Sequence, residues 1–583
     1  MYEVFVVSAD LYRMEKVLMS SYDDKDIDEN TSGSSGLGVS TTSLICDITP
    51  NELIRTVTDD YLSSLNPDDD ILPSQIEKEL LNIVRQRILV ENQTRIKSDK
   101  IKIPQHLSPH QIAKILFRMY HIVNVNCTGS LFDDCMFLAM YQESGDNAGL
   151  YIWNDLKIRK LIQEFNYNIS TKEIDETIEL LKINAPIVER TTDKNLIPCN
   201  NGIFNFETKQ LEPFSPEYVF LSKSRVNYNP LAQNVFIPMP DGEIWDVESW
   251  VADLFDDPEL EQLIWEVLSA IVRPYNRWKK VIWLYADTGN NGKGTICELA
   301  RSLVGNGSYT SIPVSKFSDR FVLEPLLHAT AIINDENSSA FIESSDVFKA
   351  IATNDVVSIE RKYKPPINYQ FFGLQIQCTN ELVRFKDKTD SLYRRQLMIP
   401  FEKTFTGIER PYIKMDYLHR PEVLEYVLYK VLNMDFDVLS EPAACRRLLD
   451  EYKIDNDPVR QFWDELREEF TWDVLPSKFV FDLYCGWMHK NIPNGKIQSR
   501  QSFKKDIKAI LRNDDMWCIS NKKIRVKPYI SAPEPLILEY NLNDWKNAKY
   551  MGGDIDKICT TSYEGVVECI MRRDVKLDDA DGE

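Results

Sequence analysis

The sequence lacks several features that would place it in common classes of protein. It has no apolar run of membrane-spanning length, and no basic region precedes the apolar residues at its N-terminus. We therefore expect neither a membrane protein nor a secretory signal. Its eleven cysteines are scattered and form no Cys-x-x-Cys pair, and its six histidines are scattered too. These patterns argue against a disulfide framework and a zinc site, and they predict a cytoplasmic protein with reduced thiols.

The sequence also lacks an overall positive charge. Its formal net charge is −22, which argues against a protein that coats nucleic acid with its whole surface. Local basic sites remain compatible with that total, because the acidic residues cluster near the two ends of the chain. The 583 residues, of which 43% are hydrophobic, exceed what one core can organise and indicate about three or four domains.

A glycine- and asparagine-rich turn is the most informative feature that is present. It follows an apolar strand expected over 281–285 and precedes a helix expected over 296–303. The pattern is close to G-x-x-x-x-G-K-[ST], in which backbone N–H groups hold phosphate and the lysine reaches the terminal phosphates. Asp287 stands for the first glycine and Gly294 for the hydroxyl residue, so Thr295 offers its hydroxyl one position late. The alternative is an ordinary turn before a helix. The candidate nucleotide-binding residues are Gly289, Asn290, Asn291, Gly292, Lys293, Gly294 and Thr295.

A second apolar strand, expected over 331–334, runs into Asp335 and Glu336. Two carboxylates at a strand end can divide the work of nucleotide hydrolysis. One holds Mg²⁺ through water, and the other orients the attacking water. With the phosphate loop, this pair predicts an enzyme that hydrolyses a nucleoside triphosphate.

Three further segments follow in order. Arg361, Lys362 and Lys364 surround an aromatic residue, a composition that suits contact with single-stranded nucleic acid and equally suits a solvated basic turn. Asn380 ends an alternating strand, where its amide could orient water or simply form a turn. The paired Arg394 and Arg395 precede another strand; they could reach a neighbouring subunit's γ-phosphate or form surface salt bridges.

Taken in order, these motifs resemble those of superfamily 3 helicases. The resemblance is closest to the phage and plasmid primase-helicase family, which is related to the poxvirus primase-helicase. It extends upstream to the segment over 198–216, and it covers roughly residues 105 to 530. The resemblance implies an AAA+ fold, a homo-hexameric ring, ATP hydrolysis with Mg²⁺ at subunit interfaces, and 3′-to-5′ translocation on DNA.

The resemblance also implies roles for single residues. Lys293 would bind phosphate, Asp335 would bind metal together with Thr295, Glu336 would activate water, and Asn380 would act as the sensor. Arg394 or Arg395 would be the arginine finger, and Arg361, Lys362 and Lys364 would belong to a hairpin in the ring channel. Too few residues precede the matched region for a primase domain, and no Asp-x-Asp strand followed by a suitable histidine is present, so we expect no primase activity.

The segment over 476–530 is locally basic. It has twelve Lys/Arg and four Asp, a net +8. Its pattern predicts two helices and then a β-hairpin over 517–527, the order of a winged helix-turn-helix. A basic helix with a basic hairpin is typical of duplex DNA binding, and the alternative is a protein-interaction module. The candidate DNA contacts are Lys504, Lys505, Lys508, Lys522, Lys523 and Arg525.

These segments predict an α/β P-loop core with a parallel sheet, between an α+β or helical region and a C-terminal winged-helix domain. The expected divisions are an accessory region with a flexible loop (1–100), a helicase-associated domain (101–240), the ATPase domain (241–420) and a C-terminal domain with an acidic tail (421–583).

The leading hypothesis is a replicative DNA helicase of a phage, plasmid or genomic island, working in the cytoplasm of the element's host. Its partners would be single-stranded and duplex DNA, copies of itself and replication proteins of the host or element, with no membrane. Two alternatives stay open. One is an ATP-switched initiator or scaffold that binds origin DNA without processive unwinding, and the other is a P-loop nucleotide kinase.

Overall fold

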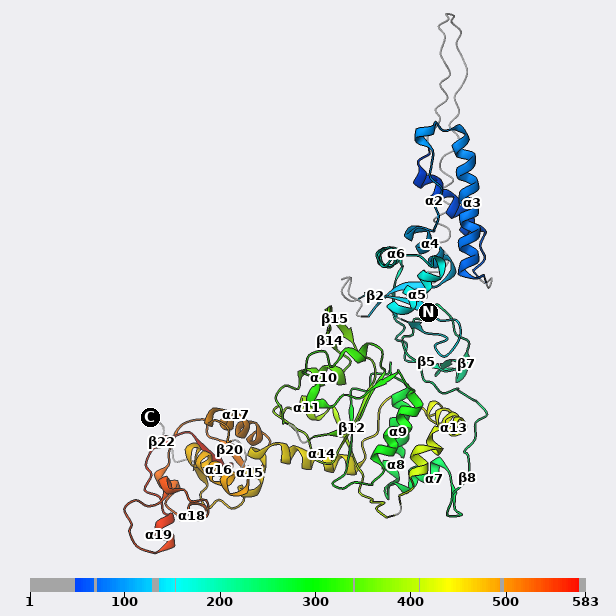
Figure 1. The fold of residues 1–583 in the computed structure, drawn as a ribbon. Coiled ribbons are helices and arrows are strands. Elements are labelled where there is room, and N and C mark those ends of the chain that lie inside the picture. Colours follow the sequence, from blue (N-terminus) through cyan, green and yellow to red (C-terminus); the bar gives the residue numbers. More distant parts are fainter. Residues whose placement is uncertain are drawn as a thin grey trace, which may run out of the picture.

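In a computed structural model of the chain, the structure describes residues 48–67, 71–127, 136–152, 154–338, 341–407, 409–492 and 497–575. The side chain of Lys364 and the serine- and glycine-rich stretch predicted as a flexible loop lie outside this description. The chain runs from a helical region through a central α/β core to a C-terminal module, and the helix α14 leads from the core to that module (Figure 1).

The first region packs helices around a small mixed sheet of order β3-β2-β1-β4. Thr49, Ser108 and Ser170 cap α2, α4 and α6, each with a capping box that satisfies helix N-terminal N–H groups. The helices share one apolar cluster with residues of β1 and β2, and other residues of this sheet pack in a cluster with the central core. Their bounds are α2 Pro50–Ser64, α3 Pro73–Thr94, α4 Pro109–Met119, β1 Ile122–Asn126, β2 Met136–Tyr141, β3 Tyr151–Ile152, α5 Asp155–Phe165, α6 Thr171–Asn184 and β4 Ile187–Glu189.

Short antiparallel strands connect this region to the core. They form a three-stranded meander and a two-stranded ribbon. Gly202 lies at φ +157°, and an added Cβ would come 2.5 Å from the Glu212 carbonyl oxygen, so the meander requires glycine there. The strands are β5 Leu196–Cys199, β6 Gly202–Asn205, β7 Gln210–Glu212, β8 Ile237–Pro238 and β9 Ile244–Trp245.

The core is a five-stranded sheet of order β11-β12-β16-β10-β18 in which every pair is parallel, as the sequence predicts for the α/β part. The strands are buried along almost their whole length because helices cover both faces of the sheet. They are β10 Val281–Tyr285, β11 Tyr309–Thr310, β12 Ala331–Asn337, β16 Leu374–Thr379 and β18 Gln396–Pro400.

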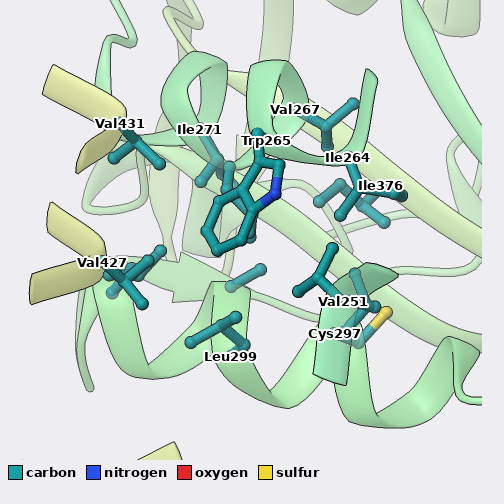
Figure 2. Packing of buried hydrophobic residues seen from close by; sticks show 14 of the residues in the cluster. Val251, Ile264, Trp265, Val267, Ile271, Cys297, Leu299, Ile376, Val427 and Val431 are labelled. Carbon is teal, nitrogen blue, oxygen red and sulfur yellow. The ribbon is translucent and has the colours of Figure 1, made fainter. Parts of the chain in front are cut away.

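One face of the sheet packs on α8 and α9, with α13 beyond them. Trp265 of α8 lies among side chains from these helices and from β16, including Leu299, Ile376 and Val427 (Figure 2). The other face packs on α10, α11 and α14 through Phe348, Leu392 and Tyr452 and the strand residue Trp283. The helices are α7 Val247–Asp253, α8 Pro258–Val272, α9 Lys293–Val304, α10 Asp346–Ala352, α11 Asp390–Tyr393, α12 Pro411–Met415, α13 Pro421–Leu432 and α14 Ala443–Asn456.

Two small pairs of strands project from the core. The antiparallel hairpin β14–β15 follows α10. The parallel pair β13–β17 joins one strand that precedes this hairpin in the sequence to one that follows it. Their bounds are β13 Phe341–Ile342, β14 Val356–Arg361, β15 Lys364–Gln370 and β17 Arg384–Phe385.

The C-terminal module has its own apolar cluster, rich in tryptophan. Its strands form a sheet of order β19-β23-β20 and a second pair, β21–β22. Its elements are α15 Pro458–Leu466, β19 Val474–Pro476, α16 Ser477–Asn491, α17 Arg500–Leu511, β20 Trp517–Ile519, β21 Ile524–Arg525, α18 Leu536–Glu539, α19 Ile555–Cys559, β22 Val566–Val567 and β23 Cys569–Arg572.

The predicted β-hairpin over 517–527 is wrong in its pairing. β20 pairs with β23 and β21 pairs with β22, so both strands bind a segment that returns about forty to fifty-five residues later. Local turn chemistry suggested a hairpin at Asn521, but hydrogen bonding to the returning segment satisfies both strands instead. The two predicted helices are present as α16 and α17.

The domain divisions stay predictions. α13 lies beyond residue 420, yet it packs in the same apolar cluster as the sheet, and Leu448 and Tyr452 of α14 pack on the other face. The packing thus favours a later boundary, near Asp457, where the cluster of the C-terminal module begins. No helix in the described part of the chain is long and apolar enough to cross a membrane.

We predict that Trp265→Ala destabilises the core strongly. The indole is 2% exposed, and its removal leaves a cavity between two helices and the sheet. Such truncations cost about 3–5 kcal/mol. Thermal unfolding should show the main transition at a clearly lower temperature than in the wild type. Tyr167→Ala is the control, because this aromatic residue is 85% exposed; an equal effect of both variants would contradict the assignment of Trp265 to the core.

Candidate nucleotide site

The predicted phosphate loop connects β10 to α9. Asn290 and Gly292 have φ values of +54° and +89°, which turn the loop sharply before the helix begins at Lys293. The backbone angle of Gly292 favours glycine, and an added Cβ would lie 2.7 Å from Leu254 Cδ2, so that side chain would have to move. The loop and the helix N-terminus therefore have the strand–turn–helix context that phosphate binding needs.

Lys293 is 6% exposed, and its ammonium donates a hydrogen bond to Asn380 Oδ1 at 2.7 Å. Burial lowers the pKa of this lysine. Asn380 directly follows β16, the neighbour of β10 in the sheet. The structure thus brings together the lysine and the amide, which are 87 residues apart in the sequence.

Asp335 and Glu336 lie at the same edge of the sheet, at the end of β12. Between the pairs Asn334–Gln377 and Asn337–Thr379, β12 has two residues where β16 has only Cys378. This β-bulge breaks the alternation of side chains, so both consecutive acids are exposed rather than one being buried. The bulge provides a pair of carboxylates that a regular strand could not present together.

Arg301, which we did not predict as a site residue, ties the acids to the phosphate-loop helix. It forms an ion pair with Asp335 and a second, at 3.3 Å, with Glu298 one turn earlier on α9. Burial works against the charge of Arg301, but the hydrogen bond with Asp335 raises its pKa above the usual value. The sequence offers one signal for Arg301 as a site residue, which is its place two helical turns after the loop.

The exposed carboxylates fit a divalent cation, since hard oxygen ligands suit Mg²⁺. Thr295 lies in the first turn of α9 and is partly exposed. Asp335 and Thr295 are the residues that would hold Mg²⁺, and this role stays a prediction.

Arg394 and Arg395 lie at the opposite edge of the sheet. The N–H of Val281, the first residue of β10, donates to the Arg395 carbonyl at 2.7 Å. The two arginines therefore lie at the N-terminal ends of the parallel strands, whereas the phosphate loop follows the C-terminal end of β10. Arg395 is partly buried and donates to Ser391 Oγ at 2.7 Å, whereas Arg394 is exposed. The two arginines are therefore not equivalent, and Arg394 is the one available to another molecule.

The basic segment after α10 forms the hairpin β14–β15, with Lys362 and Tyr363 at its turn. Tyr363 is 95% exposed at a φ of +61°, and the Lys362 ammonium lies 5.3 Å from its ring centre. Arg361 instead folds back and donates to the Pro365 carbonyl at 3.0 and 2.8 Å. Lys364 begins β15, and its side chain lies outside the described part.

A loop that sequence reasoning missed lies against this hairpin. Arg320 forms an ion pair with Glu360 of β14, with Nε and Oε2 2.6 Å apart. The next residue, Phe321, has a φ of +67° and is 40% exposed. Left-handed backbone at a bulky residue is strained, and such strain gathers at functional sites. The hairpin and this loop together present two exposed aromatic rings beside cations.

The predicted basic surface of the C-terminal module is weaker than the count over 476–530 indicates. Lys504 and Lys508 of α17 both pair with Glu568, and Lys527 pairs with Glu564. Both acids come from the returning segment, which lies outside the counted range. Over 458–573 the module has nineteen basic and sixteen acidic residues, a net +3. The candidates that are exposed and form no ion pair with another described residue are Lys505, Lys522, Lys523 and Arg525.

Three family models match the chain in succession. The D5 N-terminal-like model matches residues 83–268, a family of unknown function (DUF5906) matches 284–395, and the poxvirus D5 protein-like model matches 454–547. The first and the last of these confirm the resemblance inferred from the sequence. The middle match contains the phosphate loop, both acids, the hairpin and the two arginines.

Solved structures give more distant matches. An apo structure of the NrS-1 C-terminal region is 15% identical, with 67% of this chain and 94% of that chain covered at a TM-score of 0.39. A second NrS-1 structure, of its residues 305–718, is 14% identical with the same coverage and a TM-score of 0.37. A JCV helicase bound to a small molecule is 16% identical over 35% of this chain and 58% of that chain, at a TM-score of 0.22.

We predict that Arg394 and Arg395 differ in their effect on stability. Arg395→Ala removes the hydrogen bonds to Ser391 that join β18 to α11, at a cost of about 1 kcal/mol for each lost bond. Arg394→Ala removes an exposed side chain, for which a change within about 0.5 kcal/mol is typical. Thermal unfolding of the two variants measures this, and an equal loss of stability in both would contradict the distinction.

Proposed function

Because D5-like family models match residues 83–268 and 454–547 of the chain, we propose that it is an ATP-driven DNA helicase with an AAA+ P-loop core. The observation that carries this proposal is the hydrogen bond between Lys293 and Asn380, which joins the phosphate loop to the neighbouring strand end. The sheet order supports it, since β16 with the amide lies between the loop strand β10 and the acid strand β12. The phosphate loop, the amide and the two acids, which one chain contributes to nucleotide hydrolysis, then lie at the same edge of the sheet.

Each residue at this edge has a distinct task. Backbone N–H groups of the loop hold the phosphates, and Lys293 leaves Asn380 for the terminal phosphates when a nucleotide enters. Asn380 is then free to orient the attacking water, and Glu336 accepts its proton. Asp335 and Thr295 would hold Mg²⁺, which would offset the negative charge of the phosphate oxygens.

Arg394 completes the site of a neighbouring subunit rather than its own. The five-residue strand β18 separates it from the loop edge by about 16 Å. An exposed arginine at that distance from its own loop suits a role in trans, as in a homo-hexameric ring that hydrolyses ATP at subunit interfaces. Such a ring would translocate 3′ to 5′ on DNA, as the resemblance implies.

The hairpin β14–β15 and the loop at Phe321 would grip a single strand inside the ring. Lys362 supplies charge for phosphates, and Tyr363 and Phe321 supply faces on which bases can stack. Arg361 fixes the shape of the hairpin through its bonds to Pro365 and is a supporting residue.

The C-terminal module is proposed to be a winged helix that contacts duplex or origin DNA. The order of elements supports this topology: it runs α15, β19, α16, α17, β20 and β23, and β23 lies between β19 and β20 in the sheet. The two strands of the wing, β20 and β23, are separated in the sequence by residues 520–568. Lys505 of α17 and the exposed Lys522, Lys523 and Arg525 are its candidate contacts. Lys504 and Lys508 serve mainly to hold the returning strand through Glu568.

We predict that Lys293→Ala abolishes ATP binding and hydrolysis, whereas Glu336→Gln binds ATP without turning it over. The lysine provides the phosphate charge, and the glutamate is needed only for the chemical step. Nucleotide binding and phosphate release measure the two effects separately. Lys172→Ala is the control, because this lysine is exposed and lies on α6, outside the nucleotide site. Turnover at the wild-type rate in Glu336→Gln would remove Glu336 as the base.

We predict that the two DNA-contacting surfaces can be separated by mutation. Lys362→Ala with Tyr363→Ala should abolish strand displacement and the stimulation of ATPase by single strands, and spare duplex binding. Lys505, Lys522 and Lys523 changed together to Ala should weaken duplex binding, and the slope of log affinity against log salt should fall by about one for each lost phosphate contact.

Strand displacement also decides between the competing functions. Nucleotide turnover without stimulation by single strands would favour a kinase. Stimulated turnover and duplex binding without displacement would favour an ATP-switched scaffold. Unchanged duplex binding in the triple lysine variant would make the C-terminal module a protein-docking element.

A further inference from the structure

The phosphate loop departs from its pattern at one position that the proposed function leaves unexplained. Gly294 stands where a Ser or Thr ordinarily directs its hydroxyl toward Mg²⁺. A Cβ built on Gly294 would have one heavy atom within 4 Å, the ammonium nitrogen of Lys414, at 3.6 Å. The space in which the hydroxyl side chain would begin is therefore bordered by a positive charge from a segment 120 residues further along the chain.

Lys414 reaches this place because its segment is attached to the loop. The N–H of Phe405 donates to the Asn290 carbonyl at 2.7 Å, and the hydroxyls of Thr288 and Thr404 are 3.1 Å apart. Asn290 also donates to Glu409 Oε1 at 3.0 Å. These bonds hold the described residues of 402–414 over the loop and place α12, which contains Lys414, beside the first turn of α9.

Within the described ranges of the chain, the charge of Lys414 is matched by no ion pair. The side chain is partly buried, and within the described residues no carboxylate or carbonyl is assigned to it. The other cations of this segment are paired: Lys403 with Asp256, and Arg410 with Asp241 and Glu243. An ammonium without an ion pair in the described structure, beside the first turn of the helix that follows a phosphate loop, is complementary to a bound anion.

We propose that Lys414 is a second phosphate-binding lysine, which contacts the triphosphate of a bound nucleoside triphosphate on the side of Gly294. The inference rests on the proposed nucleotide site and deepens it. Lys293 approaches the phosphates from within the loop, and Lys414 approaches them from the segment that covers it. Gly294 is part of this arrangement, because a side chain there would occupy the space next to the ammonium.

The arrangement has a consequence for metal dependence. Part of the charge that usually comes from Mg²⁺ is supplied by a fixed ammonium, so the site should retain nucleotide when divalent cations are removed. Loss of one charge-assisted contact weakens binding by about tenfold or more. The loss from removing Lys414 should be larger in chelator than in Mg²⁺, where the cation compensates.

The test is binding of a fluorescent ATP analogue to the full chain, measured by anisotropy in Mg²⁺ and in excess chelator. Lys414→Met keeps the aliphatic stem and removes the charge, and Lys414→Arg keeps the charge. We expect Lys414→Met to bind about tenfold or more weakly in chelator, with a smaller loss in Mg²⁺, and Lys414→Arg to bind nearly as the wild type. Gly294→Ser added to Lys414→Met should restore affinity in Mg²⁺ but not in chelator.

Lys403→Met is the matched control. This lysine belongs to the same segment, but it bonds Asp256 and the carbonyls of Asp253 and Phe255, so its loss loosens the segment without removing phosphate charge. Equal losses in Lys403→Met and Lys414→Met would overturn the inference, as would wild-type binding by Lys414→Met in chelator. If Lys293→Ala still abolishes binding in that case, the proposed function stands. If the wild type binds no nucleotide in either buffer, both fail.

Discussion

The parallel pairing of β10 with β16 is the interaction on which the rest of the structure depends. It aligns Tyr285 with Thr379, so the loop after one strand and the amide after the other emerge side by side. The hydrogen bond from Lys293 to Asn380 follows from that register, and β12 adds its acids at the same edge through its own pairing with β16. A slip of one residue would move the side chains to the opposite face of the sheet and separate these groups.

The core and the outline of the site could be predicted because both depend on local patterns. The strands over 281–285 and 331–334, the turn at Gly292 and the strand that ends before Asn380 all have short-range signals, and the structure places them as expected. A parallel sheet follows from strands that alternate with helices. The common edge for Lys293, Asp335 and Asn380 then follows from parallel topology alone.

What the sequence could not predict depends on contacts between distant segments. The β-bulge at Asp335 needs the register with β16, and Arg301 needs the position of α9 beside β12. The strands β20 and β21 were assigned to each other because their true partners lie about forty to fifty-five residues away. The same returning segment brings Glu564 and Glu568 to the lysines, which a charge count over a window cannot detect.

The two edges of the sheet give the central claim its sharpest test, because the phosphate loop lies at one edge and Arg394 at the other. Lys293→Ala and Arg394→Ala subunits should each be inactive as ATPases. When mixed in equal amounts, about one interface in four pairs an intact loop with an intact arginine, so partial activity should return. Native mass spectrometry should confirm that mixed assemblies form. If such assemblies show no ATPase at any ratio, Arg394 does not act in trans, and the account of a site shared between subunits is contradicted.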